Sequence, residues 1–167
     1  MTLVSTPFDG SPANPVDQLE NLVAANEWPF ERLGDDEIAF SIGGEHTQYH
    51  LWFGWRPDAS ALEFRCAFDL NLPERRFTDI CEVVTRINDQ LWLGHFDAAP
   101  TDSSVTFRHT TIVADGVGLA PAQLEMMVEI ALASCDRAYP AFMLLLWGGK
   151  RPADAVAFAM LETVGEA

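Results

Sequence analysis

Four histidines are the first residues in this chain that could bind a metal ion or transfer a proton. His46 and His50 lie four residues apart on an expected strand, which separates them by about 13 Å at about 3.3 Å per residue, too far to share one ion. His95 and His109 fall on two later strands that we expect to pair, so these two imidazoles could approach each other. A histidine held by a hydrogen-bond partner is still a simpler explanation for either residue than a ligand or a base.

Two other catalytic patterns are incomplete. The Gly-Gly-Lys sequence at 148–150 resembles the end of a phosphate-binding loop, but Arg151 follows where a serine or threonine is needed, so we interpret the glycines as the end of a helix. The serines lack the surroundings of a catalytic nucleophile. The cysteines fall on the apolar phase of their segments, where small buried thiols are expected: Cys66, Cys81 and Cys135. The sequence therefore assigns no catalytic, cofactor-binding or metal-binding residue and predicts that the protein is not an enzyme.

Charge and apolar content limit the class of protein. The chain has 167 residues, 49% of them hydrophobic, which is enough for one core without disulfides or metals. Ten basic and 25 acidic residues give a net charge of −15, which argues against nucleic acid and anionic membranes as partners. The chain begins without the pattern of a secretory signal, and no apolar run is long enough to span a bilayer, so we expect a cytoplasmic protein.

The first half of the chain predicts a helix followed by a meander of strands. Pro15 suits the first turn of a helix with Asn14 as its cap, and apolar residues recur at helical spacing to about Asn26. The period then changes to two and predicts three antiparallel strands, over residues 37–42, 46–55 and 62–70. The glycine pair at 43–44 is expected to supply positive φ angles in the first hairpin.

The second half predicts a helix, a strand pair and a helical tail. The expected ranges are 73–92 for the helix and 95–98 and 105–113 for the strands. A long helix begins at Pro121, and Pro140 within it removes one backbone hydrogen bond, so we expect a kink and two pieces there. Pro152 begins the last helix.

Together these elements predict an α+β fold. Its twisted antiparallel sheet consists of a three-stranded meander and a second strand pair, with helices packed against it, in the order α-βββ-α-ββ-α-α. Residues 1–14 contain several proline and glycine residues and are expected to form a mobile N-terminal tail. Residues 15–165 are expected to form a single domain, because no linker or internal repeat divides them.

Five tryptophans are the clearest functional signal. Trp52 is out of phase with the main apolar set of its strand, so one face of the sheet is expected to offer an aromatic anchor. The run from Phe142 to Trp147 is too apolar on all sides for a solvated helix, so we expect it to lie beneath other elements or another subunit. The candidate interface residues are Trp52, Trp55, Phe142, Leu145 and Trp147.

Several segments together resemble the YbjN-type family of bacterial sensory transduction regulators. They are Asn-Pro-Val at 14–16, Trp-Pro-Phe at 28–30, Tyr-His-Leu-Trp-Phe at 49–53, Asn-Asp-Gln-Leu-Trp-Leu-Gly-His-Phe at 88–96, and the stretch 140–152. The resemblance covers residues 14 to 165, and 88–96 is its most specific part. It implies a fold similar to type III secretion chaperones, a role in regulating motility, stress response and cell-surface traits, and no catalytic residues.

Two hypotheses about function follow. The leading one is a non-catalytic regulatory or chaperone-like module that binds segments of a partner protein through an aromatic surface. Its acidic rim would suit a basic or amphipathic partner, and the resemblance implies pairing as a homodimer. The alternative is a small-molecule sensor with a pocket between the sheet and the long kinked helix. An enzyme would require His95, His109 and Asp97 to converge in a cleft.

Overall fold

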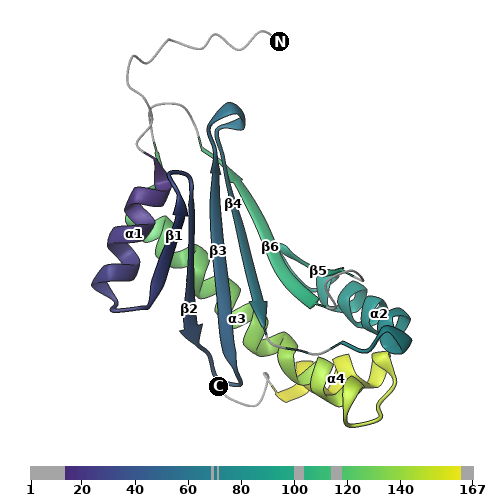
Figure 1. The fold of residues 1–167 in the computed structure, drawn as a ribbon. Helices are drawn as coiled ribbons and strands as arrows, with labels where there is room; N and C mark the ends of the chain where they lie inside the picture. Colours follow the sequence, from purple (N-terminus) through teal and green to yellow (C-terminus); the bar gives the residue numbers. More distant parts are fainter. Residues whose placement is uncertain (1–13, 69, 71, 100–103, 114–117, 163–167) are drawn as a thin grey trace, which may run out of the picture.

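One antiparallel sheet of six strands forms the centre of the computed structural model, which describes residues 14–68, 70, 72–99, 104–113 and 118–162. The strands lie in the order β1-β2-β3-β4-β6-β5 (Figure 1). Their bounds are β1 Phe30–Gly34, β2 Glu37–Gly43, β3 Gln48–Arg56, β4 Ala61–Phe68, β5 His95–Ala99 and β6 Ser104–Ile112. The predicted α+β class is confirmed, and the predicted strand pair joins the meander through β4 and β6.

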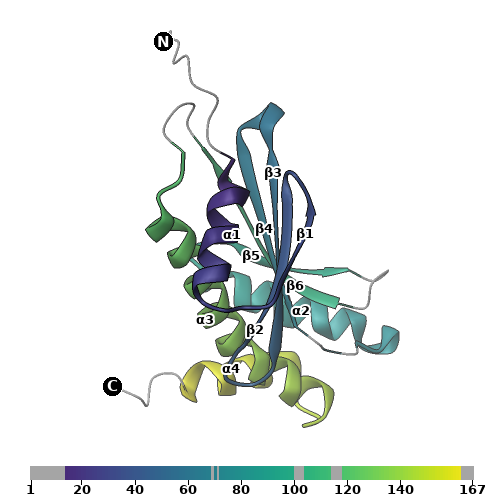
Figure 2. The same cartoon turned by 60° about the vertical axis from the view of Figure 1, so that its left-hand side comes forward.

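The described helices cover one face of the sheet and leave the other open. Their bounds are α1 Pro15–Ala25, α2 Phe77–Asn88, α3 Pro121–Leu146 and α4 Pro152–Glu162. Both α1 and α3 contact the strands from the same side, to the left of the sheet in Figure 2, while α2 packs beside β5 and α4 packs on α2 and α3. We call the side covered by α1 and α3 the inner face and the opposite side the outer face.

Aromatic residues fill the layer between the inner face and α3. Phe53 on β3 and Phe64 on β4 stack with their ring centroids 4.3 Å apart, and Phe68 lies 5.8 Å from Phe142 of α3. These four side chains are almost fully buried. Burial of this apolar surface supplies the main stabilisation of the fold.

The first strand, β1, was missed by the sequence prediction, which gave the meander three strands. The sequence of β1, Phe-Glu-Arg-Leu-Gly, does not alternate between apolar and polar residues, and most of the strand is exposed. It is held instead by pairing with β2 and by Arg32, which donates hydrogen bonds of 2.8 Å to Asp17 and 2.7 Å to Glu20 of α1. A strand held by hydrogen bonds and ion pairs does not need alternating apolar residues, so the sequence pattern used to predict strands does not detect it.

Two predicted glycine turns have different outcomes. Gly149 ends α3 as expected, with a φ of 63°, and Lys150 N–H donates to the carbonyl of Leu144. The prediction for the glycine pair at 43–44 was wrong, because neither residue is among the described glycines with positive φ. Gly44 is required for a different reason: a Cβ atom there would overlap the ring of Tyr49.

Two helix predictions also need correction. The helix expected over 73–92 is shorter, because a 3-10 turn at Glu74–Arg76 precedes α2 and α2 ends at Asn88. The Asn88 side chain accepts a hydrogen bond of 2.7 Å from Phe96 N–H and donates one of 2.9 Å to the Phe96 carbonyl. Since β5 is the last strand of the sheet, this amide takes the place of a further strand.

The long helix α3 is continuous, so the expected division at Pro140 was wrong. Proline removes one intrahelical N–H but leaves the neighbouring hydrogen bonds intact. The residues that follow it, Ala141, Phe142 and Leu145, are fully buried, and this packing keeps the helix in one piece. The helix at the other end begins as predicted, because Asn14 accepts a hydrogen bond of 2.9 Å from Val16 N–H. Most of the predicted N-terminal tail lies outside the described residues.

Candidate functional site

The outer face of the sheet carries a row of side chains that runs across all six strands. The strand register aligns its members directly opposite one another. We call this the outer row, and it consists of Glu31, Ala39, Trp52, Arg65, Arg108 and His95. It changes from acidic at β1 through aromatic at β3 to basic at β4 and β6.

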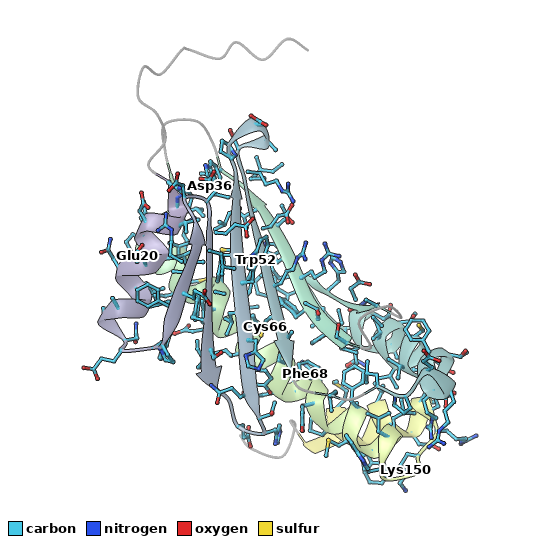
Figure 3. All side chains as sticks on the ribbon, in the orientation of Figure 1. Glu20, Asp36, Trp52, Cys66, Phe68 and Lys150 are labelled. Atoms are coloured by element: carbon cyan, nitrogen blue, oxygen red, sulfur yellow. The ribbon has the colours of Figure 1, made fainter. Side chains whose placement is uncertain are left out.

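Trp52 lies at the middle of this row, on the central part of the sheet (Figure 3), and three neighbours hold it in place. Its ring lies over Gly54, where a Cβ atom would overlap the indole. The guanidinium of Arg65 lies 4.8 Å from the ring centroid, and the indole N–H donates a hydrogen bond of 3.3 Å to Glu37. A partly exposed tryptophan with a fixed orientation loses little conformational entropy when it binds a partner.

Charged side chains surround this tryptophan in pairs. Arg56 lies 2.6 Å from Oε1 of Glu63, and this hydrogen bond holds the pKa of Glu63 below its ordinary value. The second oxygen of Glu63, Oε2, has no hydrogen bond from the described residues and lies 3.6 Å from Arg65. Arg108 pairs with Asp97 at 2.9 Å. The acidic rim expected from the sequence is therefore a mixture of both charges.

Two shallow hollows lie on either side of Trp52. The first, of about 300 Å³, is bounded by β1, β2 and β3 and is lined by Phe30, Ala39 and His50 among others. The second, of about 200 Å³, lies over β4, β6 and β5, and Arg65 and Arg108 line it.

The five predicted interface residues do not form one surface. Trp55 is 8% exposed, and Phe142 and Leu145 are 0% exposed, so these three belong to the core of the chain. Within the apolar run from Phe142 to Trp147, Phe142 and Leu145 lie under other elements, as one of the two expectations had it, but the end of the run at Trp147 does not. Trp52 is on the outer face, whereas Trp147 follows α3 and is 62% exposed.

The histidines are placed mainly as structural residues. His46 stacks on Tyr139 with centroids 5.5 Å apart, and His50 lies 2.9 Å from the Ser41 hydroxyl. His109 lies 3.0 Å from the Thr111 hydroxyl, and burial lowers its pKa, with a further lowering from the charge of His95. Within the described part of the chain, no three His, Cys, Asp or Glu residues are arranged to hold a metal ion.

The layer between the sheet and α3 is filled by the aromatic side chains described above. Beside this layer, α2, α3 and α4 enclose a cavity of only about 10 Å³, next to Leu91 and Ser134. A cavity of that size holds about one water molecule. These observations give no support to a ligand pocket of the kind that a small-molecule sensor requires.

Two features of the molecule were missed by sequence reasoning. Arg65 and Arg108 become neighbours only through the register of β4 and β6, although the outward phase of each strand was a usable signal. Cys66 and Cys135, which are 69 positions apart, meet in the core with their sulfur atoms 3.6 Å apart. Cys81, expected to be buried, is only partly so.

Comparisons with known proteins agree with this architecture. Residues 15–143 match the model of a family described as "Putative bacterial sensory transduction regulator", YbjN. The structure is similar to the crystal structure of YbjN from E. coli, titled "a putative transcription regulator", with a TM-score of 0.53 and 10% sequence identity. That match covers 74% of this chain and 87% of the other. No curated protein matches the chain.

Among the described residues, no helix has both the length and the apolar character needed to cross a membrane.

Proposed function

This chain belongs to the YbjN family of bacterial sensory transduction regulators, and we propose that it is a non-catalytic regulator that binds a segment of a partner protein on the outer face of its sheet. The family is described as one of sensory transduction regulators. The observation that carries the proposal is Trp52, which is partly exposed and is fixed by Gly54, Arg65 and Glu37.

The arrangement of the sheet supports this proposal. Because α1 and α3 pack on the inner face, the hydrophobic core is built from side chains of that face, and the side chains of the outer face lie outside it. An aromatic side chain on such a face adds little to folding, and aromatic anchors are common at the centres of binding sites. The hollows on both sides of Trp52 give an extended segment room for its side chains.

A comparison of two tryptophan variants tests the proposal. Wild type, Trp52→Ala and Trp92→Ala are isolated from the native cells with the proteins bound to them. Trp92 is the control, because it is 80% exposed and lies outside the sheet. We expect the same protein to remain bound to wild type and Trp92→Ala and to be lost from Trp52→Ala. Retention by both variants, or loss from both, contradicts the proposal.

Two further expectations from the sequence belong to the same proposal. We place the regulator in the cytoplasm, and we propose that it self-associates as a homodimer through the exposed Trp147. Light scattering on wild type and Trp147→Ala tests the second point: the measured mass of wild type is expected to be twice that of the variant. Equal masses contradict it.

A further inference from the structure

Two arginines stand directly opposite each other on the outer face. Arg65 of β4 is paired with Arg108 of β6, and Arg108 is paired in turn with His95 of β5. Directly opposed side chains on neighbouring antiparallel strands have their Cβ atoms only about 4.5–5.5 Å apart, and like charges in such pairs are destabilising. The chain nevertheless places two of its ten lysine and arginine residues directly opposite each other, although it has 25 acidic residues, any of which at one of these positions would remove the repulsion.

The acidic residues nearby neutralise this pair incompletely. Asp97 accepts one hydrogen bond from Arg108, and no other described residue accepts one from that guanidinium. Glu63 binds Arg56 through Oε1 and lies 3.6 Å from Arg65, which is beyond hydrogen-bonding distance. Arg65 and Arg108 have exposed side-chain fractions of 45% and 41%, so an incoming group can reach both.

The hollow of about 200 Å³ beside Trp52 brings these donors together. His95, Thr110 and Glu63, whose Oε1 accepts a hydrogen bond from Arg56, line it along with the two arginines. The planar fork of an arginine matches the two oxygens of a carboxylate, which makes paired arginines a recognition element for acidic groups. The strongly negative net charge of the chain does not prevent this, because charges beyond the Debye length of about 8 Å are screened at physiological salt.

We infer that Arg65, Arg108 and His95 form a carboxylate-binding site for an acidic side chain of the partner segment. This inference rests on the proposed docking of a protein segment at Trp52 and adds the chemistry of that segment: an acidic residue next to an apolar or aromatic one. The apolar residue packs on Trp52, and the carboxylate lies between the two guanidinium groups.

Three short peptides serve as probes. They are acetyl-Glu-Phe-Glu-Phe-amide and its Gln and Lys counterparts, titrated into the ¹⁵N-labelled full chain at physiological salt. We expect the Glu peptide to shift the amide resonances of Arg65, Arg108 and His95 and to bind about tenfold more tightly than the Gln peptide. The double variant Arg65→Gln, Arg108→Gln is expected to remove that preference. Arg86→Gln, which removes an arginine paired with Glu82 on α2, is expected to keep it.

Several outcomes overturn the inference. They are equal binding of the Glu and Gln peptides, tighter binding of the Lys peptide, no response to the Glu peptide at these residues, and survival of its preference in the double variant. Inorganic phosphate is titrated separately, and equally tight binding of phosphate at the same residues identifies a free-anion site instead. Failure of the proposed function can be told apart from failure of this inference, because the proposed function is tested by partner loss from Trp52→Ala and retention by Trp92→Ala, without the peptides. A partner that the double variant retains and Trp52→Ala loses leaves the docking surface in place without the acidic contact.

Discussion

The hydroxyl of Tyr49 on β3 donates a hydrogen bond of 2.5 Å to Oδ1 of Asp136 on α3. The same oxygen accepts a bond of 3.0 Å from the backbone N–H of Glu45, in the loop that joins β2 to β3. The missing side chain of Gly44 leaves space for the tyrosine ring. One carboxylate therefore ties the β2–β3 hairpin to the helix that covers the sheet.

Tyr49→Phe is expected to lower the free energy of unfolding by about 2 kcal/mol, because it removes a hydrogen bond to a charged group. Burial raises the pKa of the Tyr49 hydroxyl, and the hydrogen bond to Asp136 raises it further. The unfolded chain therefore releases this proton above pH 10 while the folded chain keeps it, so wild type loses stability as the pH rises beyond about 10. Tyr49→Phe has no hydroxyl to ionise and lacks this pH-dependent loss. The difference in free energy of unfolding between wild type and Tyr49→Phe is therefore expected to narrow in alkaline solution.

Denaturant unfolding at several pH values measures both effects. The control is Tyr139→Phe, which removes the hydroxyl of the other tyrosine of the chain and is expected to cost about 0.5 kcal/mol or less. A constant difference between wild type and Tyr49→Phe from pH 7 to pH 11 would contradict the assignment.

Asn88→Ala is expected to loosen β5. The substitution leaves the N–H and carbonyl of Phe96 without their amide partner, at a cost of about 2 kcal/mol. Hydrogen exchange is the direct measurement. In Asn88→Ala the amides of β5 are expected to exchange faster than they do in wild type, and this acceleration is expected to be larger in β5 than in β3. Asn21→Ala is a matched control, since the Asn21 side chain makes one exposed hydrogen bond to Asp17 within α1. Equal exchange of β5 in wild type and Asn88→Ala would rule out this role.

Gly54→Ala is expected to displace the Trp52 indole, because the new methyl group occupies the position of the ring. The indole N–H resonance of Trp52 is expected to shift as its bond to Glu37 breaks, and partner binding is expected to fall as it does in Trp52→Ala. Gly34→Ala is the control, because no described atom beyond the residue itself and its two chain neighbours lies within 4 Å of its added Cβ. An unchanged indole resonance in Gly54→Ala would show that the ring does not depend on this glycine.

The three thiols are expected to react at different rates with an aromatic disulfide reagent. Cys81 on α2 is partly exposed and is expected to react first. Cys66 and Cys135 are fully buried, and burial raises the pKa of the Cys135 thiol well above its ordinary value, which keeps the reactive thiolate scarce. Their modification is expected to follow unfolding. Loss of the fast phase in Cys81→Ser confirms the order, and three equal rates would contradict it.

The sequence predicted the elements that have strong local signals. Prolines at 15, 121 and 152 do begin helices, because a residue without an N–H is tolerated in the first turn. The alternation through Tyr49, Leu51 and Phe53 correctly identified a strand buried on one face. The missed strand β1 and the continuity of α3 both depend on tertiary contacts, which have no local period.

The candidate site was predicted in part. Trp52 was singled out because it breaks the apolar phase of its strand, and it does lie on the outer face, partly exposed. Trp55, Phe142 and Leu145 were chosen for hydrophobicity alone, which does not distinguish a core from an interface. Arg65 and Arg108 could not be paired from the sequence, because the register between residues 43 positions apart depends on the whole sheet.

In the described part of the chain the helices cover one side of the sheet and leave the other uncovered, and this affects how such proteins diverge. Side chains on the uncovered side can be exchanged with little loss of folding stability. A shared fold at 10% sequence identity is compatible with that freedom. A single scaffold can therefore acquire different recognition surfaces in separate lineages, so each member needs its own binding experiments.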